Sequence, residues 1–328
     1  MGQYLAVVGI PRDLKHPFYV GRNEATDVEA FGGIWIEERL WYPPVERMTV
    51  RAAELAAQAV RQRGPAGATI GVEMPFLPAD AFQTLRAQLP EARFVDATPV
   101  LAELRAVKQP HEIQRLREVH RITAEAIREV LASGHPDQTT RELNRRVERA
   151  VTARGAVFLY CYTNVGPGLL RTPSALRWGR GNPLHLDAGA EVEDYVSDVC
   201  RMGSVGKPAP EAEEMYRTCI QVVDRLREQI APGMRCRELD RLGWELMRSN
   251  PWGKYGRFLA HGLGMVSHEP PEVAQEGDRP LEEGMVISLE AEFVHPGVGH
   301  IKYEDSVVVT ASGCEGLGDV LREWVTVE

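Results

Sequence analysis

The chain has 328 residues, of which 44% are hydrophobic and 26% charged, and 47 acidic against 38 basic side chains give a formal net charge of −9. These values are ordinary for a globular protein, and the length is sufficient for two domains. The acidic balance argues against a nucleic-acid partner, because phosphate backbones are bound by basic surfaces, and no apolar run approaches the ~18 residues of a membrane-spanning helix, so we expect no membrane partner either.

The first third of the chain predicts a small α/β domain. Residues 1–30 carry no regular pattern, and the segments after them alternate strands with amphipathic helices. The predicted elements are a strand at 32–41, a helix at 50–62, a strand at 69–73, a helix at 79–88 and a strand at 92–96. This alternation is typical of strands layered against helices.

A domain boundary is predicted between residues 100 and 110, and it divides the chain into domains of residues 1–105 and 106–328. Pro110, His111 and Glu112 open a long helix that extends to about residue 133, with apolar side chains at helical spacing. Further helices are predicted at 139–152, 211–230 and 236–249. We expect them to cover a sheet formed by the segments between them.

The segments 183–190 and 195–201 predict a hairpin whose turn contains the polar residues 191–194. Folded symmetrically about 192/193, this hairpin sets Asp187 directly opposite Asp198. Directly opposed carboxylates repel each other, and a cation between them turns the repulsion into ligation. Alternatively, a longer turn shifts the register and leaves both aspartates facing water.

The segments 284–293 and 299–310 predict a second hairpin, joined by a loop that contains Pro296 and Gly297. Glu290 and Glu304 can then oppose each other, with Lys302 and Glu292 on the same face. A strand face with this many charges either faces solvent or lines a site, and taken alone the solvated face is the more common outcome.

A glycine-rich loop at 259–271 separates the two hairpins. His261 precedes Gly262 and Gly264, and His268 follows seven residues later with Glu269 and two prolines. Glycines allow the backbone to approach a site closely. Histidines in such a loop are candidate metal ligands, although a single histidine is more often a packed or surface residue.

Together these segments resemble the pita-bread metallopeptidases, the family of methionine aminopeptidase, aminopeptidase P, prolidase and the metal-free creatinase. The resemblance extends over about residues 105–325 and is closest to the prolidase and aminopeptidase P branch. The matching stretches are Asp187-Ala-Gly with Tyr195-Val-Ser-Asp198 and Arg201, His261-Gly-Leu-Gly with His268-Glu-Pro-Pro, Gly284-Met-Val with Glu290, and Tyr303-Glu304-Asp305 with Val309-Thr310.

The resemblance implies an α/β (α+β) protein with a C-terminal pita-bread domain, in which helices back a curved antiparallel sheet, and a shortened N-terminal creatinase-like domain. It implies two divalent metal ions, Mn, Co or Zn. Asp187 would bind one ion, His261 and Glu290 the other, and Asp198 and Glu304 both. Two such ions can activate water and polarise a carbonyl.

The resemblance also implies the residues that meet the substrate. His268 would contact it near the scissile carbonyl, and Glu290 would carry a proton to the leaving amine. Residues Arg257, Lys302 and His185 are further candidates for substrate binding. The family histidine expected about 17 residues before Asp187 is replaced by Leu170, and Lys302 stands where arginine is common, which removes a bidentate contact to a carboxylate.

From these features we expect a dinuclear peptidase that cleaves Xaa-Pro bonds in dipeptides or short peptides. The alternatives are a metal-dependent hydrolase or lyase of a small non-peptide metabolite, which Leu170, Arg257 and Lys302 favour, and a non-catalytic binding protein, which the retained ligands argue against. A homodimer is implied by the resemblance. The cysteines are odd in number and lack zinc-knuckle spacing, and no signal peptide is recognised, so a cytoplasmic location is expected.

Overall fold

The computed structural model describes residues 5–22, 33–64 and 67–328. The chain divides into two compact units, Met1–Leu101 and Ala102–Glu328. Helix α3 (Thr98–Ala106) contains both the predicted boundary, after residue 105, and the boundary between these units, after Leu101. Each unit has its own buried apolar residues, and each is described below by itself.

The N-terminal unit contains a three-stranded sheet in the order β1-β2-β3 and a parallel pair of strands, β4 and β5. Helix α1 buries an alanine-rich face against β2 and β3, as its helical spacing predicts. The described elements are β1 (Val7–Gly9), β2 (Phe18–Arg22), β3 (Glu38–Tyr42), α1 (Met48–Arg63), β4 (Thr69–Val72), α2 (Ala79–Gln88) and β5 (Arg93–Asp96).

Two expectations for this unit need correction. The irregular structure predicted for residues 1–30 is wrong at β1 and β2, which are too short to give a clear alternating pattern. The strand predicted at 32–41 begins only at Glu38, and residue 32 lies outside the described residues. The helices and strands from α1 to β5 are confirmed within two residues at each end.

The long helix predicted from Pro110 is α4 (Pro110–Ala132). Proline suits the first helical position because it has no backbone N–H to leave unpaired, and the Glu112 carboxylate accepts a hydrogen bond of 2.7 Å from the Gln109 backbone N–H. The other predicted helices are also confirmed, with small differences at their ends. They are α5 (Thr140–Thr152), α6 (Pro210–Arg227) and α7 (Cys236–Arg248).

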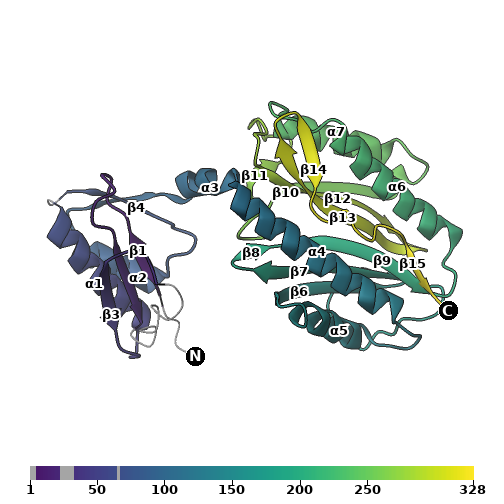
Figure 1. Cartoon of the computed structure of the whole chain (residues 1–328), viewed down its shortest axis with the longest axis horizontal. Helices are drawn as coiled ribbons and strands as arrows, with labels where there is room; N and C mark the ends of the chain where they lie inside the picture. The colour runs from purple at the N-terminus through teal and green to yellow at the C-terminus, as the bar shows by residue number, and fades with distance from the viewer. Residues whose placement is uncertain (1–4, 23–32, 65–66) are drawn as a thin grey trace. The chain divides into compact units, whose positions relative to one another are not determined.

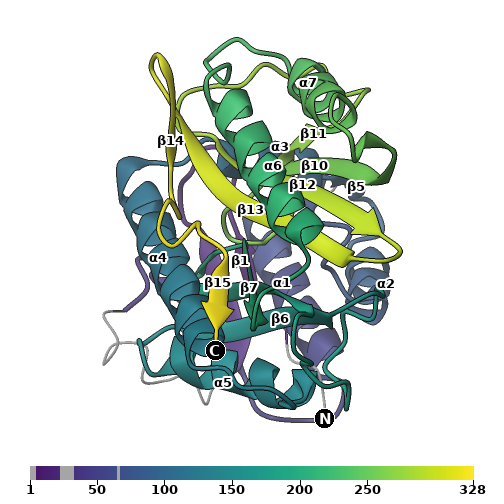
Figure 2. The same ribbon diagram turned by 90° about the vertical axis from the view of Figure 1, so that its right-hand side faces the viewer.

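Within the described C-terminal unit, ten strands form one sheet, with the central order β11-β10-β12-β13-β9-β7-β6. Helix α4 packs along β7 and β9, and α6 along β12 and β13 (Figures 1 and 2). The strands are β6 (Val157–Val165), β7 (Pro183–Val192), β8 (Tyr195–Val196), β9 (Val199–Val205), β10 (Gly256–Gly262), β11 (Glu269–Val273), β12 (Val286–His295), β13 (Gly299–Thr310), β14 (Gly313–Gly316) and β15 (Val325–Val327). None of the helices in the described part of the chain combines the length and apolar character that a membrane crossing requires.

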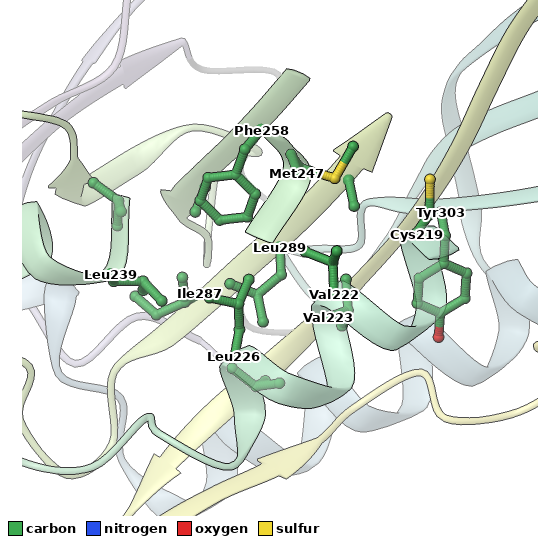
Figure 3. Close-up of a cluster of buried hydrophobic side chains, with 14 of the residues drawn as sticks. Cys219, Val222, Val223, Leu226, Leu239, Met247, Phe258, Ile287, Leu289 and Tyr303 are labelled. Atoms are coloured by element: carbon green, nitrogen blue, oxygen red, sulfur yellow. The ribbon is translucent and has the colours of Figure 1, made fainter. Parts of the chain in front are cut away.

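The two-residue period of the central strands separates their side chains into two faces. Ile287 and Leu289 of β12 lie beside Val222 and Leu226 of α6, and Tyr303 of β13 lies beside Cys219 in the same apolar cluster (Figure 3). The alternate residues on β12 and β13 therefore point away from this apolar core, and those on β7 point away from Leu184 and Leu186, which belong to a second apolar cluster. We call that opposite side of the sheet the site face, and its central charged residues are Asp187, Glu290, Lys302 and Glu304.

Candidate metal centre

The first hairpin has a different register from the one predicted. Asp187 pairs with Cys200, not with Asp198. The turn consists only of Glu193 and Asp194, whose positive φ angles of 48° and 68° fit a two-residue hairpin turn. This tight turn moves the centre of the hairpin by one residue, and Asp198 comes to lie between β8 and β9. The predicted direct opposition of the aspartates is therefore wrong.

The second hairpin has the predicted register. Glu290 pairs with Glu304, and Glu292 pairs with Lys302. The Ser288 hydroxyl donates a hydrogen bond of 3.0 Å to Glu304 Oε1. The carboxylates are buried, so the solvated alternative does not apply to this face.

The five residues predicted as metal ligands converge on the site face despite the altered register. The ligand atoms of Asp187, Asp198 and Glu304 lie within 4.8 Å of one another. The same limit holds for His261, Glu290 and Glu304. All five residues are buried. Four carboxylates and one imidazole provide the oxygen-rich donor set that divalent cations prefer, so these residues fit a pair of such ions.

The loop predicted at 259–271 is wrong at both ends, because β10 includes His261 and β11 begins directly after His268. The two histidines lie together at one side of this cluster. His261 Nε2 is 3.1 Å from Glu290 Oε1, and its ring stacks on that of His268 with centroids 3.8 Å apart. Burial lowers the pKa of His261, but Glu290 outweighs it and the net pKa is raised. Burial and the adjacent His261 lower the pKa of His268, which favours its neutral imidazole.

The Lys302 ammonium lies among the carboxylates. Its Nζ is 2.9 Å from Asp187 Oδ2, 2.5 Å from Glu290 Oε2 and 2.8 Å from Glu304 Oε2. The lysine side chain is only 3% exposed. The structure therefore places Lys302 against three of the predicted metal ligands.

Arg171 is a second cation at the cluster, and it was not predicted from the sequence. Its guanidinium forms an ion pair with Asp187 Oδ2 and lies 4.6 Å from the Tyr162 ring centroid. About a third of its side chain, 37%, stays exposed. In the sequence, Arg171 is marked only by following Leu170, the residue that replaces the expected family histidine. The Leu170 side chain is partly exposed in the structure.

The pKa values of the four buried carboxyl groups shift in opposite directions. Burial and Glu290 raise the pKa of Glu304 to about 8. Burial and Glu304 raise the pKa of Asp198 well above its ordinary value. Burial also opposes ionisation of Asp187 and Glu290, but Lys302 together with neighbouring groups outweighs it, and both pKa values are lowered. The neighbouring groups are His185 and Arg171 for Asp187, and His261 for Glu290. Negative charge at Asp198 and Glu304 is thus incompletely compensated by the chain itself, and a metal ion would compensate it.

The other candidate substrate contacts differ in their accessibility. His185 is fully buried, with Nε2 3.5 Å from Asp187 Oδ2 and its ring 4.5 Å from that of His300. Burial and His300 lower the pKa of His185 to about 3, so its ring is neutral at pH 7. Arg257 is exposed, and its Nη1 lies 3.9 Å from Glu292 Oε1.

A buried ion pair fixes the segment next to His268, and this too was not identified from the sequence. Lys108 Nζ lies 2.8 Å from Glu269 Oε1, and both side chains are 1% exposed. Gly264 leaves room for this pair, because a Cβ at that position would come within 2.3 Å of Glu269 Oε1. The residue that follows His268 is therefore anchored to the start of the C-terminal unit.

Glu292 is expected to make the stability of the protein depend on acid pH. Burial opposes its ionisation, but His300 Nε2, 2.5 Å away, outweighs it and the pKa falls from 4.5 to about 2. A carboxyl with a lowered pKa stabilises the fold above pH 4.5, and this contribution is lost as the pH falls towards 2. We expect the free energy of unfolding to decrease by about 3 kcal/mol over that range on account of this group.

Urea unfolding at a series of pH values measures this effect. Glu292→Gln is expected to remove that part of the acid slope, whereas Glu272→Gln, which changes an exposed glutamate on β11, is expected to keep it. An unchanged slope in Glu292→Gln would contradict the assignment.

Two family models match the chain in succession. The model of the Creatinase/Prolidase N-terminal domain matches residues 1–107. The model of metallopeptidase family M24 matches residues 114–311, which is more than half of the chain and includes every predicted metal ligand.

Individual relatives agree with the family models. An Xaa-Pro dipeptidase from Pyrococcus furiosus is 30% identical over 233 residues, which are 68% of this chain and 66% of the relative. An Xaa-Pro dipeptidase from Pyrococcus horikoshii is 27% identical over 263 residues, which are 78% of this chain and 75% of the relative. The solved structure of an Xaa-Pro dipeptidase from Bacillus anthracis has a TM-score of 0.86 at 23% identity, covering 100% of this chain and 90% of that chain. The structural likeness confirms the expected fold.

Proposed function

The chain belongs to metallopeptidase family M24, and from this premise we propose that it hydrolyses Xaa-Pro bonds in dipeptides or short peptides. The convergence of the five predicted ligands on the site face carries this proposal. The names of the Pyrococcus relatives support the choice of substrate.

We propose that Asp187 holds one divalent ion, that His261 and Glu290 hold a second, and that Asp198 and Glu304 contact both. The oxygen-rich donor set suits Mn²⁺, and the imidazole also admits Co²⁺ or Zn²⁺. When bound, such ions supply an activated water at neutral pH and polarise the scissile carbonyl.

The chain's own residues would orient the peptide and move its protons. His268, partly exposed beside His261, would donate a hydrogen bond to the substrate near the scissile carbonyl. Glu290 would carry a proton to the leaving imide nitrogen. Lys302 is already engaged by three carboxylates, so recognition of a substrate carboxylate would fall to Arg171 and Arg257, whose guanidinium groups reach solvent.

A peptide panel tests this function. The protein is reconstituted with Mn²⁺ or Co²⁺ and supplied with Xaa-Pro dipeptides and tripeptides, with the matching Xaa-Ala peptides as controls. We expect release of proline from Xaa-Pro dipeptides and no comparable turnover of Xaa-Ala. Metal-loaded protein that cleaves none of the panel would overturn the peptidase assignment.

That last outcome would favour the second candidate, a metal-dependent hydrolase or lyase of a small non-peptide metabolite. The observation that favours it is the pair of cations, Lys302 and Arg171, beside Asp187.

We further propose, from the family resemblance, that the protein works as a homodimer in the cytoplasm. Light scattering of the purified protein would measure the mass of the assembly.

A further inference from the structure

We propose that His185, Asp187 and Cys200 form a separate site for a soft cation such as Zn²⁺ or Cd²⁺, and that an ion held there withdraws Asp187 from the proposed two-ion centre. The ligand atoms of these three buried residues lie within 4.8 Å of one another. Binding of the soft cation needs no substrate. Only its effect on the two-ion centre rests on the proposed function.

The register of the sheet places the Cys200 thiol among the carboxylates. Cys200 on β9 pairs with Asp187 on β7 and with Glu304 on β13. Directly paired residues of neighbouring strands share a face of the sheet, and their Cβ atoms are about 4.5–5.5 Å apart. His185 lies two residues before Asp187 and therefore on the same face. The site face thus carries a sulfur donor and a nitrogen donor beside one of its carboxylates.

The His185 imidazole is the observation that points to a ligand. Its side chain is 0% exposed, and Nε2 lies 3.5 Å from Asp187 Oδ2. Neither ring nitrogen has a hydrogen-bond partner among the described residues. A buried polar group without a partner costs free energy, and ligation of a cation would recover that cost.

The donor types select the kind of cation. A thiolate, an imidazole and a carboxylate are the ligands that Zn²⁺ takes in proteins, and thiolates favour soft ions, whereas Mn²⁺ favours oxygen donors. When the ion binds, bonds form to the Cys200 sulfur, a His185 nitrogen and an Asp187 oxygen, and the thiol proton passes to solvent. In the part of the chain that the structure describes, no other cysteine belongs to a group of converging ligand atoms.

Asp187 is common to both sites, because it also belongs to a carboxylate group of the two-ion centre. Its Oδ2 contacts Lys302 and Arg171. The Arg171 side chain is 37% exposed and can turn towards solvent, which opens a route to Asp187, while Lys302 keeps its contacts with two glutamates. An ion bound to Cys200 would therefore engage the Asp187 carboxylate, and Mn²⁺ in the two-ion centre would lose a ligand.

Titration of the metal-free full chain with Cd²⁺ tests the site without any peptide. A thiolate bound to Cd²⁺ gives an ultraviolet charge-transfer band that carboxylate and imidazole ligands do not give. We expect the wild-type protein to gain this band and Cys200→Ser to lack it. His185→Leu is expected to bind the same ion more weakly by about tenfold or more.

A matched control excludes adventitious binding to another thiol. Cys314 is the cysteine that is not fully buried, and Cys314→Ser is expected to keep the band. Cys200→Ala, whose side chain also fits the space of the thiol, gives a second variant if Cys200→Ser does not fold. A wild-type protein without the band, or an unchanged band in the Cys200 variants, would overturn the proposed site.

Displacement of Mn²⁺ tests the effect on the two-ion centre. The Mn²⁺-loaded protein is titrated with Cd²⁺, and the released Mn²⁺ is measured by electron paramagnetic resonance. Cys200→Ser is expected to need about tenfold more Cd²⁺ than the wild type for half-release, because its remaining donors prefer Cd²⁺ less. Equal release from both proteins would contradict the withdrawal of Asp187. Since neither measurement uses a substrate, a protein that binds Cd²⁺ through Cys200 but cleaves no peptide would support this site while overturning the proposed function.

Discussion

Replacement of Glu304 by alanine is expected to lower kcat/KM for Xaa-Pro peptides by about a thousandfold or more. Glu304 is fully buried at the centre of the site face, and its ligand atoms belong to both groups of converging ligands. Removing it takes a ligand from both proposed ions at once, which no neighbouring side chain can replace. Steady-state kinetics with a metal-reconstituted enzyme and an Xaa-Pro dipeptide would measure the loss.

A matched control separates this effect from general damage. Glu315 lies on the neighbouring strand β14, where it forms a surface ion pair with Arg117. Glu315→Ala is expected to keep near-normal activity, because exposed ion pairs contribute little. The Glu304→Ala protein is expected to remain folded, since the lost carboxyl is one whose ionisation the fold disfavours. Substantial turnover by a folded Glu304→Ala would contradict its assignment as a shared ligand.

Replacement of Arg201 by methionine is expected to destabilise the protein by about 3–5 kcal/mol. The Arg201 guanidinium is buried and pairs with Asp305 Oδ2 at 2.7 Å. It also donates hydrogen bonds to the backbone carbonyls of Cys200 and Glu304, at 3.0 and 2.8 Å, and to that of Gly318. Methionine would leave a buried carboxylate without its counter-ion and several carbonyls without their donor.

Two further variants check this explanation by urea unfolding. Arg237 forms an exposed pair with Asp278, and Arg237→Met is expected to cost less than about 1 kcal/mol. The double variant Arg201→Met with Asp305→Leu is expected to be more stable than Arg201→Met alone, because it removes the unpaired charge. An Arg201→Met protein as stable as the wild type would contradict a stabilising role for the buried Arg201–Asp305 pair between β9 and β13.

The loss of Arg201 is also expected to weaken metal binding. Arg201 joins β9, next to the segment that carries Asp198, to the backbone of Glu304 on β13. These two carboxylates must stay within a few ångströms of each other to share an ion. Metal affinity should therefore weaken together with stability, and equilibrium dialysis of the folded variant would detect it.

The sequence by itself determined most of the elements of the C-terminal unit and the identity of the converging residues. Helix α4 was predictable because a proline start and apolar residues at helical spacing are local signals. The pairing of Glu290 with Glu304 was predictable because the alternating pattern of two long strands specifies the register. The short strands β1 and β2 escaped prediction because a few residues carry too little pattern, and the nine-residue β6 was not predicted either.

Only the tertiary structure decided the arrangement within the site. Two left-handed residues in a turn, Glu193 and Asp194, set Asp187 against Cys200, and the conformation of a turn is not legible from alternation alone. The aspartates still converge because the pairing shifts by two residues, so Asp198 stays on the same face as Cys200 and lies diagonally across from Asp187. The alternation placed Lys302 on the correct strand face, but it did not show which carboxylates the ammonium contacts, and Arg171 was not predicted. Lys302 and Arg171 meet Asp187 through long side chains that come from distant strands and loops, and where such charges end is fixed by burial and by the carboxylates around them, which exist only in the folded chain.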